Sequence, residues 1–118
     1  MSSFALELSK KRCQPCEGSV KPFDLKTTQK WLEQLSSWSL GQDGKSITRV
    51  YSMKNFVQAV QLIEQIAKVA EAENHHPDIH LTSYRKLVIE LATHSIGGLS
   101  ENDFILAAKI EELPKALK

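Results

Sequence analysis

One long amphipathic helix, set between two pairs of strand-like segments, constrains the fold of this chain more than any other feature. From about residue 54 to residue 74, apolar residues recur at helical spacing and polar residues occupy the opposite side. Proline disfavours the helical conformation of the residue before it, so Pro77 is predicted to end the helix. The width of the apolar stripe predicts that this helix packs on a sheet.

Strand-like segments lie on both sides of the long helix. Before it, residues 38–40 and 45–52 flank the turn residues Gly41–Gly44 and are predicted to form a hairpin. After it, residues 79–84 and 86–93 are predicted as two further strands, the second with clear alternation of apolar residues. These segments together predict a sheet of four strands.

Two more helices complete the predicted order of elements. Asp24 is suited to cap one that runs to about Leu35, and residues 100–103 open another in capping-box form. The order is then α-β-β-α-β-β-α. It predicts an α+β fold, a two-layer α/β sandwich with a four-stranded antiparallel sheet and helices on one face.

The N-terminal segment and the two cysteines are less informative. The 118 residues are predicted as a single domain, 1–118, in which residues 1–23 form an extended N-terminal arm, with at most a loose helical turn, because they show no sustained hydrophobic period. Cys13 and Cys16 cannot staple a fold of this size, and a thiolate zinc site needs four cysteines. Free thiols are expected, with a zinc site completed by histidines or a redox pair as alternatives.

Charge and hydropathy exclude several functional classes. The 15 Lys and Arg residues against 14 Asp and Glu residues give a net charge of +1, so we predict no nucleic-acid partner. No apolar run is long enough to span a bilayer, so no membrane partner is predicted. The first ten residues lack the order of a secretory signal, and a cytoplasmic location is expected.

Three of the four histidines fall at the ends of predicted elements, where functional sites tend to lie. Glu71 precedes His75 by four residues, so the two side chains are expected to face each other, and the carboxylate and the helix end favour the imidazolium form of His75. His76 is expected to point elsewhere, and His94 follows the last strand. Imidazoles in different protonation states supply the donor and the acceptor that acid–base catalysis needs.

Structural roles stay open for the same side chains. A His-His pair before proline can cap a helix by bonding its last carbonyls, and His94 can be a strand-end residue. Asp103 can simply bond the backbone at the start of the last helix, and His80 is given no direct role. No metal is predicted, because the adjacent His75 and His76 diverge on a helix and the His-Glu-x-x-His spacing does not occur.

Several uncommon residues agree in type and spacing with one known family. Residues 71–79, Tyr84, residues 93–95 and residues 98–104 resemble the signature of the pterin-4a-carbinolamine dehydratases, which is an acidic residue, His-His-Pro, an aromatic residue, Thr-His and a late Asp. The resemblance covers about residues 27–112. The Cys-x-x-Cys pair also resembles that of some bacterial members.

This resemblance implies an enzyme, a hydro-lyase that removes water from 4a-hydroxytetrahydropterin and gives quinonoid dihydropterin. The reaction belongs to the recycling of the cofactor of aromatic amino-acid hydroxylases. The resemblance implies no metal or organic cofactor. It also implies a pterin substrate, a homodimer or homotetramer, and an aromatic amino-acid hydroxylase as a candidate protein partner.

By the same resemblance, the catalytic positions of the family fall on His75, His76, His94 and Asp103. The substrate-binding positions fall on Asn74, Thr93 and Ser95, with Glu71 and Trp38 at the margin of the pocket. We predict that His75 and His76 are the principal acid–base pair, that His94 orients the substrate or shares the acid role, and that Asp103 orients His94.

Two other functions stay open at this stage. Some animal members of the family also act as dimerisation cofactors for a homeodomain transcription factor, so a non-catalytic binding or dimerisation module is one alternative. A pterin-binding protein related to molybdopterin metabolism is the other. Three histidines and an aspartate at these spacings favour the enzyme, because a pure binding module has no need of them.

Overall fold

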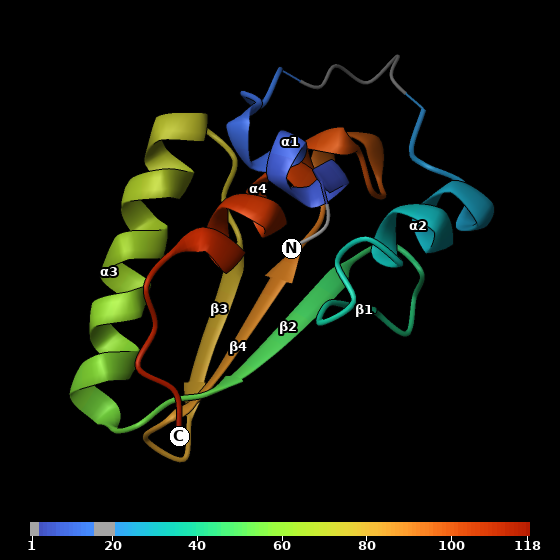
Figure 1. The fold of residues 1–118 in the computed structure, drawn as a ribbon. Helices are drawn as coiled ribbons and strands as arrows, with labels where there is room; N and C mark the ends of the chain where they lie inside the picture. Colours follow the sequence, from blue (N-terminus) through green and yellow to red (C-terminus); the bar gives the residue numbers. More distant parts are fainter. Residues whose placement is uncertain (1–2, 16–20) are drawn as a thin grey trace.

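The chain folds into a four-stranded antiparallel sheet with helices packed against it, and this confirms the predicted α+β class (Figure 1). The computed structural model describes residues 3–15 and 21–118. The elements along the described chain are α1 (Ser3–Lys10), α2 (Leu25–Leu32), β1 (Ser39–Leu40), β2 (Ile47–Ser52), α3 (Phe56–Glu73), β3 (Asp78–Thr82), β4 (Lys86–Leu91), the 3-10 helix η1 (His94–Ile96) and α4 (Glu101–Glu112).

One face of the sheet carries the core, as the alternation along β4 predicts. The strand order is β1-β2-β4-β3, with every neighbouring pair antiparallel. Leu87, Ile89 and Leu91 on β4 are fully buried, whereas Val88 and Glu90 between them are partly exposed. Such alternation is typical of an antiparallel sheet with one face on the core and one toward solvent. In Figure 1, α4 crosses in front of the sheet, with α1 and α3 beside it.

Helix α3 begins and ends at asparagines. The Asn55 side chain accepts a backbone N–H of the first turn, and Asn74 ends the helix in the left-handed conformation, with φ of 51°. The helix ends next to the predicted residue 74, and Asn74 rather than Pro77 terminates it, because Asn tolerates the left-handed conformation that ends helices. As a result His75 and His76 lie beyond the helix rather than on its last turn.

The N-terminal segment differs from the extended arm predicted for residues 1–23. Residues 3–10 form α1, whose Ala5 and Leu8 are buried in the core. Helix α4 packs against both α1 and α3, so most of its side chains are buried. A helix as short as α1 is stabilised mainly by such packing, so its sequence alone carries little signal. The single-domain organisation stays a prediction.

Helix α2 begins as predicted and ends earlier. The Asp24 carboxylate accepts the backbone N–H of Thr27 at 2.7 Å, which is the expected cap, and this hydrogen bond lowers the pKa of Asp24. The helix ends at Leu32 rather than near Leu35, and Leu35 instead contributes to the core from the turn that follows.

A polar cluster around Glu111 ties the end of α4 to β2. The Glu111 Oε1 atom accepts hydrogen bonds from Tyr51 Oη at 2.6 Å, Arg49 Nε at 2.8 Å and Trp38 Nε1 at 2.9 Å. Burial acts to raise the pKa of Glu111, but the hydrogen bonds from Tyr51 and Arg49 and the nearby positive charges outweigh burial and lower it. Burial, reinforced by Glu111, raises the pKa of Tyr51.

Replacing Glu111 with glutamine is expected to lower the free energy of unfolding by about 2 kcal/mol near pH 7, because a charged acceptor of three hydrogen bonds becomes neutral. The pKa of Glu111 is lower in the folded state than its ordinary value of 4.5. Its stabilising contribution is therefore present above that value and is lost as the pH falls through the folded-state pKa. Urea unfolding of both proteins should give a difference that shrinks below about pH 4.5. A difference independent of pH would contradict this account.

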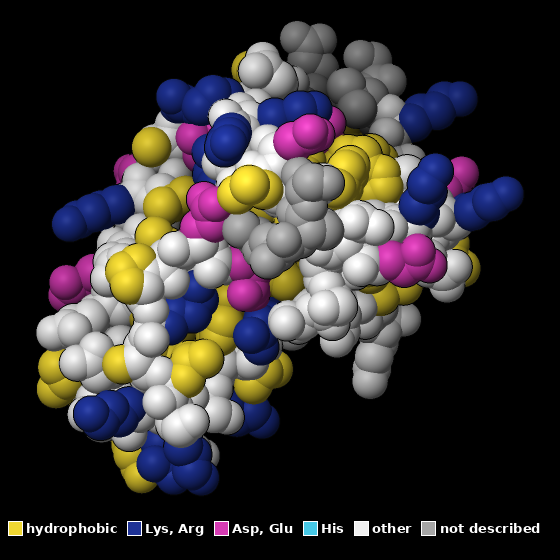
Figure 2. Space-filling view, in the orientation of Figure 1, with side chains coloured by type: hydrophobic (Ala, Val, Ile, Leu, Met, Phe, Trp, Pro, Cys, Tyr) yellow, Lys and Arg dark blue, Asp and Glu magenta, His cyan; other side chains and the backbone are white. Residues whose placement is uncertain are grey.

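Charged side chains of both signs lie on the surface of the folded chain. Figure 2 shows Lys and Arg side chains spread over this face of the molecule among Asp and Glu side chains. Within residues 3–15 and 21–118, no helix combines the length and the apolar character that crossing a membrane requires.

Candidate active site

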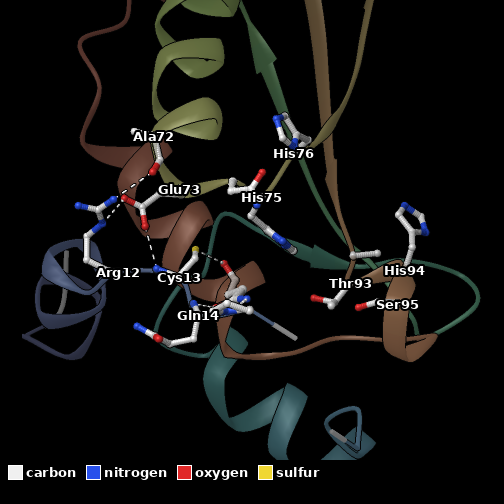
Figure 3. A pocket seen from close by; sticks show the side chains of 14 residues that line it. Arg12, Cys13, Gln14, Ala72, Glu73, His75, His76, Thr93, His94 and Ser95 are labelled. Carbon is white, nitrogen blue, oxygen red and sulfur yellow. Dashed lines mark hydrogen bonds and ion pairs between the residues drawn. The ribbon is translucent and has the colours of Figure 1, made fainter. Parts of the chain in front are cut away.

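A cavity of about 590 Å³ lies where the end of α3, the end of β4 and the first turn of α4 meet (Figure 3). A volume of this order suits a small-molecule ligand. Six of the predicted site residues line it, namely Asn74, His75, His76, Thr93, His94 and Ser95. The adjacent imidazoles of His75 and His76 are therefore brought to one cavity with that of His94, which is remote in sequence.

His75 is held by Asp103 at the inner side of the cavity. The distance from His75 Nε2 to Asp103 Oδ1 is 2.7 Å, and the His75 side chain is only 13% exposed. A carboxylate accepts hydrogen bonds, so Nε2 carries the ring proton and a neutral His75 keeps its lone pair on Nδ1. Asp103 thus orients His75, and not His94 as the sequence suggested.

Hydrogen bonds to both carboxylate oxygens hold Asp103 in place. Its side chain is fully buried, and Oδ2 accepts hydrogen bonds from Thr93 Oγ1 at 2.8 Å and from the Ser100 backbone N–H at 3.0 Å. Thr93 Oγ1 also lies 2.7 Å from Ser100 Oγ. The capping-box role predicted for Asp103 and its contact with His75 therefore coexist, because each carboxylate oxygen serves a different partner.

His76 pairs with Glu71 on the outer side of the cavity. The His76 Nε2 atom is bonded to Glu71 Oε2, and the two side chains are 56% and 76% exposed. The sequence predicted that Glu71 faces His75, as it would if the helix continued. The left-handed Asn74 turns the chain away from the helical path, so Glu71 contacts the following histidine instead.

The residues after β4 form a tight turn that presents His94 and Ser95 to the cavity. Thr93 and Gly98 close this turn, with the Thr93 N–H donating to the Gly98 carbonyl at 2.8 Å. Gly97 has φ of +68°, a conformation that favours glycine and lets the chain return after η1. Both His94 and Ser95 are exposed at the cavity.

Three of the predicted site residues do not line the cavity. Asp103 lies beneath it and bonds two residues that line it, His75 and Thr93, while Glu71 lies outside and contacts His76. Trp38 is buried in the cluster around Glu111, to which its indole N–H donates, so the structure does not bring it to the pocket margin.

The family model for pterin 4 alpha carbinolamine dehydratase matches residues 21–113, a range that contains every one of the histidines and acids just described. The chain belongs to this family. The predicted resemblance is confirmed, and with it the class of enzyme, a dehydratase and hydro-lyase.

Relatives of the dehydratase family match most of the chain. A bacterial relative that bears the family name, from Halorhodospira halophila, is 44% identical over 108 residues, which are 92% of this chain and 98% of the relative. Pterin-4-alpha-carbinolamine dehydratase 2, mitochondrial, from Arabidopsis thaliana is 40% identical over 91% of this chain and 59% of that protein.

A solved structure of the same family shares the fold. It is described as a transcriptional coactivator/pterin dehydratase from Brucella melitensis, and it superposes with a TM-score of 0.72 at 30% sequence identity. The superposition covers 77% of this chain and 96% of that chain. The four-stranded sheet and its helices are thus the scaffold that this chain shares with that structure.

One set of cavity residues was not predicted from the sequence, the segment 12–15 that follows α1. Cys13 belongs to it, and burial, reinforced by the charge of Glu73, raises the pKa of the Cys13 thiol to about 12. A protonated thiol is a poor nucleophile and a poor metal ligand. Cys16 lies outside the described residues. Within residues 3–15 and 21–118, no group of three or more His, Cys, Asp or Glu side chains could hold a metal ion.

Proposed function

We propose that this cavity dehydrates 4a-hydroxytetrahydropterin to quinonoid dihydropterin, with His75 and His76 as the principal proton-transfer pair. The observation that carries the proposal is that His75, His76 and His94 line one cavity while a buried carboxylate fixes the first of them. Each positioned proton transfer accelerates a reaction by about 10²–10⁴-fold. That range suits a substrate already inclined to lose water.

The reaction needs one acid and one base. The bond from C4a to the hydroxyl oxygen breaks, and that oxygen leaves as water after taking a proton from the acid. The adjacent ring nitrogen loses its proton to the base, and the electron pair of the N–H bond forms the new double bond to C4a. The proton gained by the base equals the proton lost by the acid, so exchange with solvent restores both groups.

His75 suits the role of the base. Asp103 accepts the proton on Nε2, which leaves Nδ1 as the acceptor of the neutral ring. After Nδ1 takes the proton, the buried carboxylate stabilises the resulting imidazolium, as in other Asp–His pairs.

His76 suits the role of the acid. Its Nε2 atom is bonded to the Glu71 carboxylate, which orients the ring, and the exposed imidazole can give a proton to the leaving oxygen and regain one from solvent. Glu71 thus acts through His76, without lining the cavity. His94 is exposed at the cavity beside Ser95, so it can bind the leaving hydroxyl or share the acid role.

The purified protein is expected to convert enzymatically generated carbinolamine faster than the spontaneous background. The rate should be the same with and without a chelator, since imidazoles supply both proton transfers. Absorbance of quinonoid dihydropterin measures the rate. A rate no higher than background in the unaltered protein would refute the enzymatic proposal and favour the non-catalytic binding module. If a chelator abolished the activity and zinc restored it, the reaction would depend on a metal ion and not on acid–base catalysis by imidazoles.

Assembly, partner and location form the remaining part of the proposal. The family resemblance implies a homodimer or homotetramer and an aromatic amino-acid hydroxylase as the source of the substrate. A cytoplasmic location stays a prediction, and the plant relative is named as mitochondrial. The role in molybdopterin metabolism has no specific observation in its favour.

A further inference from the structure

One wall of the cavity lies outside the part of the chain that defines the family. Residues 12–15, which we call the N-terminal wall, line the cavity but precede the matched residues 21–113. In Figure 3, Arg12, Cys13 and Gln14 lie on one side of His75, and His94 and Ser95 lie on the other. The cavity is therefore bounded by a segment that the family signature does not contain.

The first anchor of the N-terminal wall is on α3. The Cys13 backbone N–H donates to Glu73 Oε1 at 2.7 Å, and Arg12 Nε lies 2.8 Å from Glu73 Oε2. A further hydrogen bond joins the Arg12 guanidinium to the Ala72 carbonyl at 3.0 Å. The Glu73 side chain is only 6% exposed, so this carboxylate bonds to the wall rather than to solvent.

The second anchor is Asn102, in the first turn of α4. Its Oδ1 atom accepts the Gln14 backbone N–H at 2.9 Å, and its Nδ2 atom donates to the Gln14 carbonyl. One amide therefore satisfies both backbone groups of Gln14, much as a neighbouring strand would. Asn102 is 6% exposed, and an amide is the side chain that offers one acceptor and one donor side by side.

Both anchors adjoin the residues that hold His75. Asn102 immediately precedes Asp103, which orients His75, and Glu73 lies on the last turn of α3, just before the chain reaches His75. The wall and the proton-transfer residue are therefore supported by the same two helix ends. A wall held on rigid elements can confine a flat ring at a constant distance from His75.

We propose that the N-terminal wall is a substrate-binding surface of the active site and that Asn102 is its positioning residue. The inference rests on the proposed function. The wall takes no part in proton transfer, since the raised pKa of its thiol makes it a weak acid and the backbone N–H groups of Cys13 and Gln14 are already hydrogen-bonded. It confines the pterin ring, so its loss should weaken substrate binding and leave the chemical step intact.

Asn102→Asp tests the proposal, because aspartate keeps the acceptor for the Gln14 N–H but places a carboxylate oxygen against the Gln14 carbonyl. We expect KM to rise about tenfold, which corresponds to about 1.4 kcal/mol, with kcat within about twofold. Gln14→Pro removes the N–H from the other side without altering α4, and should have the same effect. The matched control is Lys11→Ala, which removes the exposed ion pair with Glu101 and should leave both constants unchanged.

Trypsin cleavage after Arg12 supplies a readout that does not depend on turnover. In the unaltered protein, saturating biopterin, a stable oxidised pterin, should slow this cleavage, as followed by the masses of the fragments. In Asn102→Asp, cleavage should be faster and biopterin should protect less.

The outcomes separate the two proposals. An unaltered protein without dehydratase activity would refute the proposed function, while protection by biopterin would still support the wall as a pterin-binding surface. If the unaltered protein is active and both Asn102→Asp and Gln14→Pro keep its KM, the proposed role of the wall in substrate binding is wrong. A fall in kcat at constant KM would overturn it too, because Asn102 would then act through Asp103. If Asn102→Asp does not fold, the KM of Gln14→Pro and the protection of the unaltered protein by biopterin test the proposed role of the wall.

Discussion

His76→Ala is expected to lower kcat for dehydration by about 10²–10⁴-fold, the usual contribution of one positioned proton transfer. The fold should be unaffected, because the His76 side chain is 56% exposed and its one described partner, Glu71, is exposed as well. The rate is measured on enzymatically generated carbinolamine, and urea unfolding checks that stability is unchanged.

The matched control for this variant is His80→Ala. His80 is also 56% exposed and also lies near a carboxylate, with Nε2 at 3.7 Å from Glu90 Oε1, but it is on β3 and does not line the cavity. Both variants remove one exposed imidazole beside an acid, and only the first should lose activity. Equal rates for the two variants would remove His76 from the mechanism.

His75→Ala is expected to lower kcat by a similar factor of about 10²–10⁴, but at a cost in stability that His76→Ala does not have. The His75 side chain is 13% exposed, and its removal leaves Asp103 Oδ1 buried without its partner. An unsatisfied buried group costs about 1–3 kcal/mol, and more when it is charged. Urea unfolding and the dehydration assay measure the two effects separately.

The double variant His75→Ala/Asp103→Asn distinguishes the two roles of His75. Asparagine is uncharged and can still accept the Ser100 N–H, so part of the lost stability should return. Activity should not return, because no imidazole remains to take the proton. Recovery of activity together with stability would mean that His75 is a structural partner of Asp103 and not a base.

The long helix, the two strand pairs and the capped last helix were predictable because their signals are local. Hydrophobic periodicity along α3 and alternation along β4 are set by the spacing of neighbouring residues, and so are the caps at Asp24 and Ser100. Helix α1 was not predictable, because Ala5 and Leu8 become core residues only through contact with α4, which is remote in sequence.

The sequence predicted which residues belong to the site better than it predicted which of them contact each other. The spacing of Asn74, His75 and His76, followed by Thr93-His94-Ser95, identified residues that the structure brings to one cavity. Their partners were predicted incorrectly. The rule that residues four apart face each other holds only inside a helix, and the left-handed Asn74 ends α3 before His75.

For Trp38 and Asp103, too, the sequence did not predict the contacts of the side chain. The resemblance places Trp38 at the pocket margin and Asp103 among the catalytic positions. Trp38 instead donates to Glu111 in a separate cluster, and Asp103 bonds His75 rather than the nearer histidine in sequence, His94. Such choices depend on how β4, α3 and α4 pack, which no local pattern encodes.

The amino-acid sequence by itself determined the family, the order of the central elements and the set of imidazoles, because these depend on residue type and spacing along the chain. Only the tertiary structure decided which acid holds which imidazole and that residues 12–15 border the cavity. Those contacts join residues far apart in sequence, and their geometry arises only when the helix ends meet over the sheet.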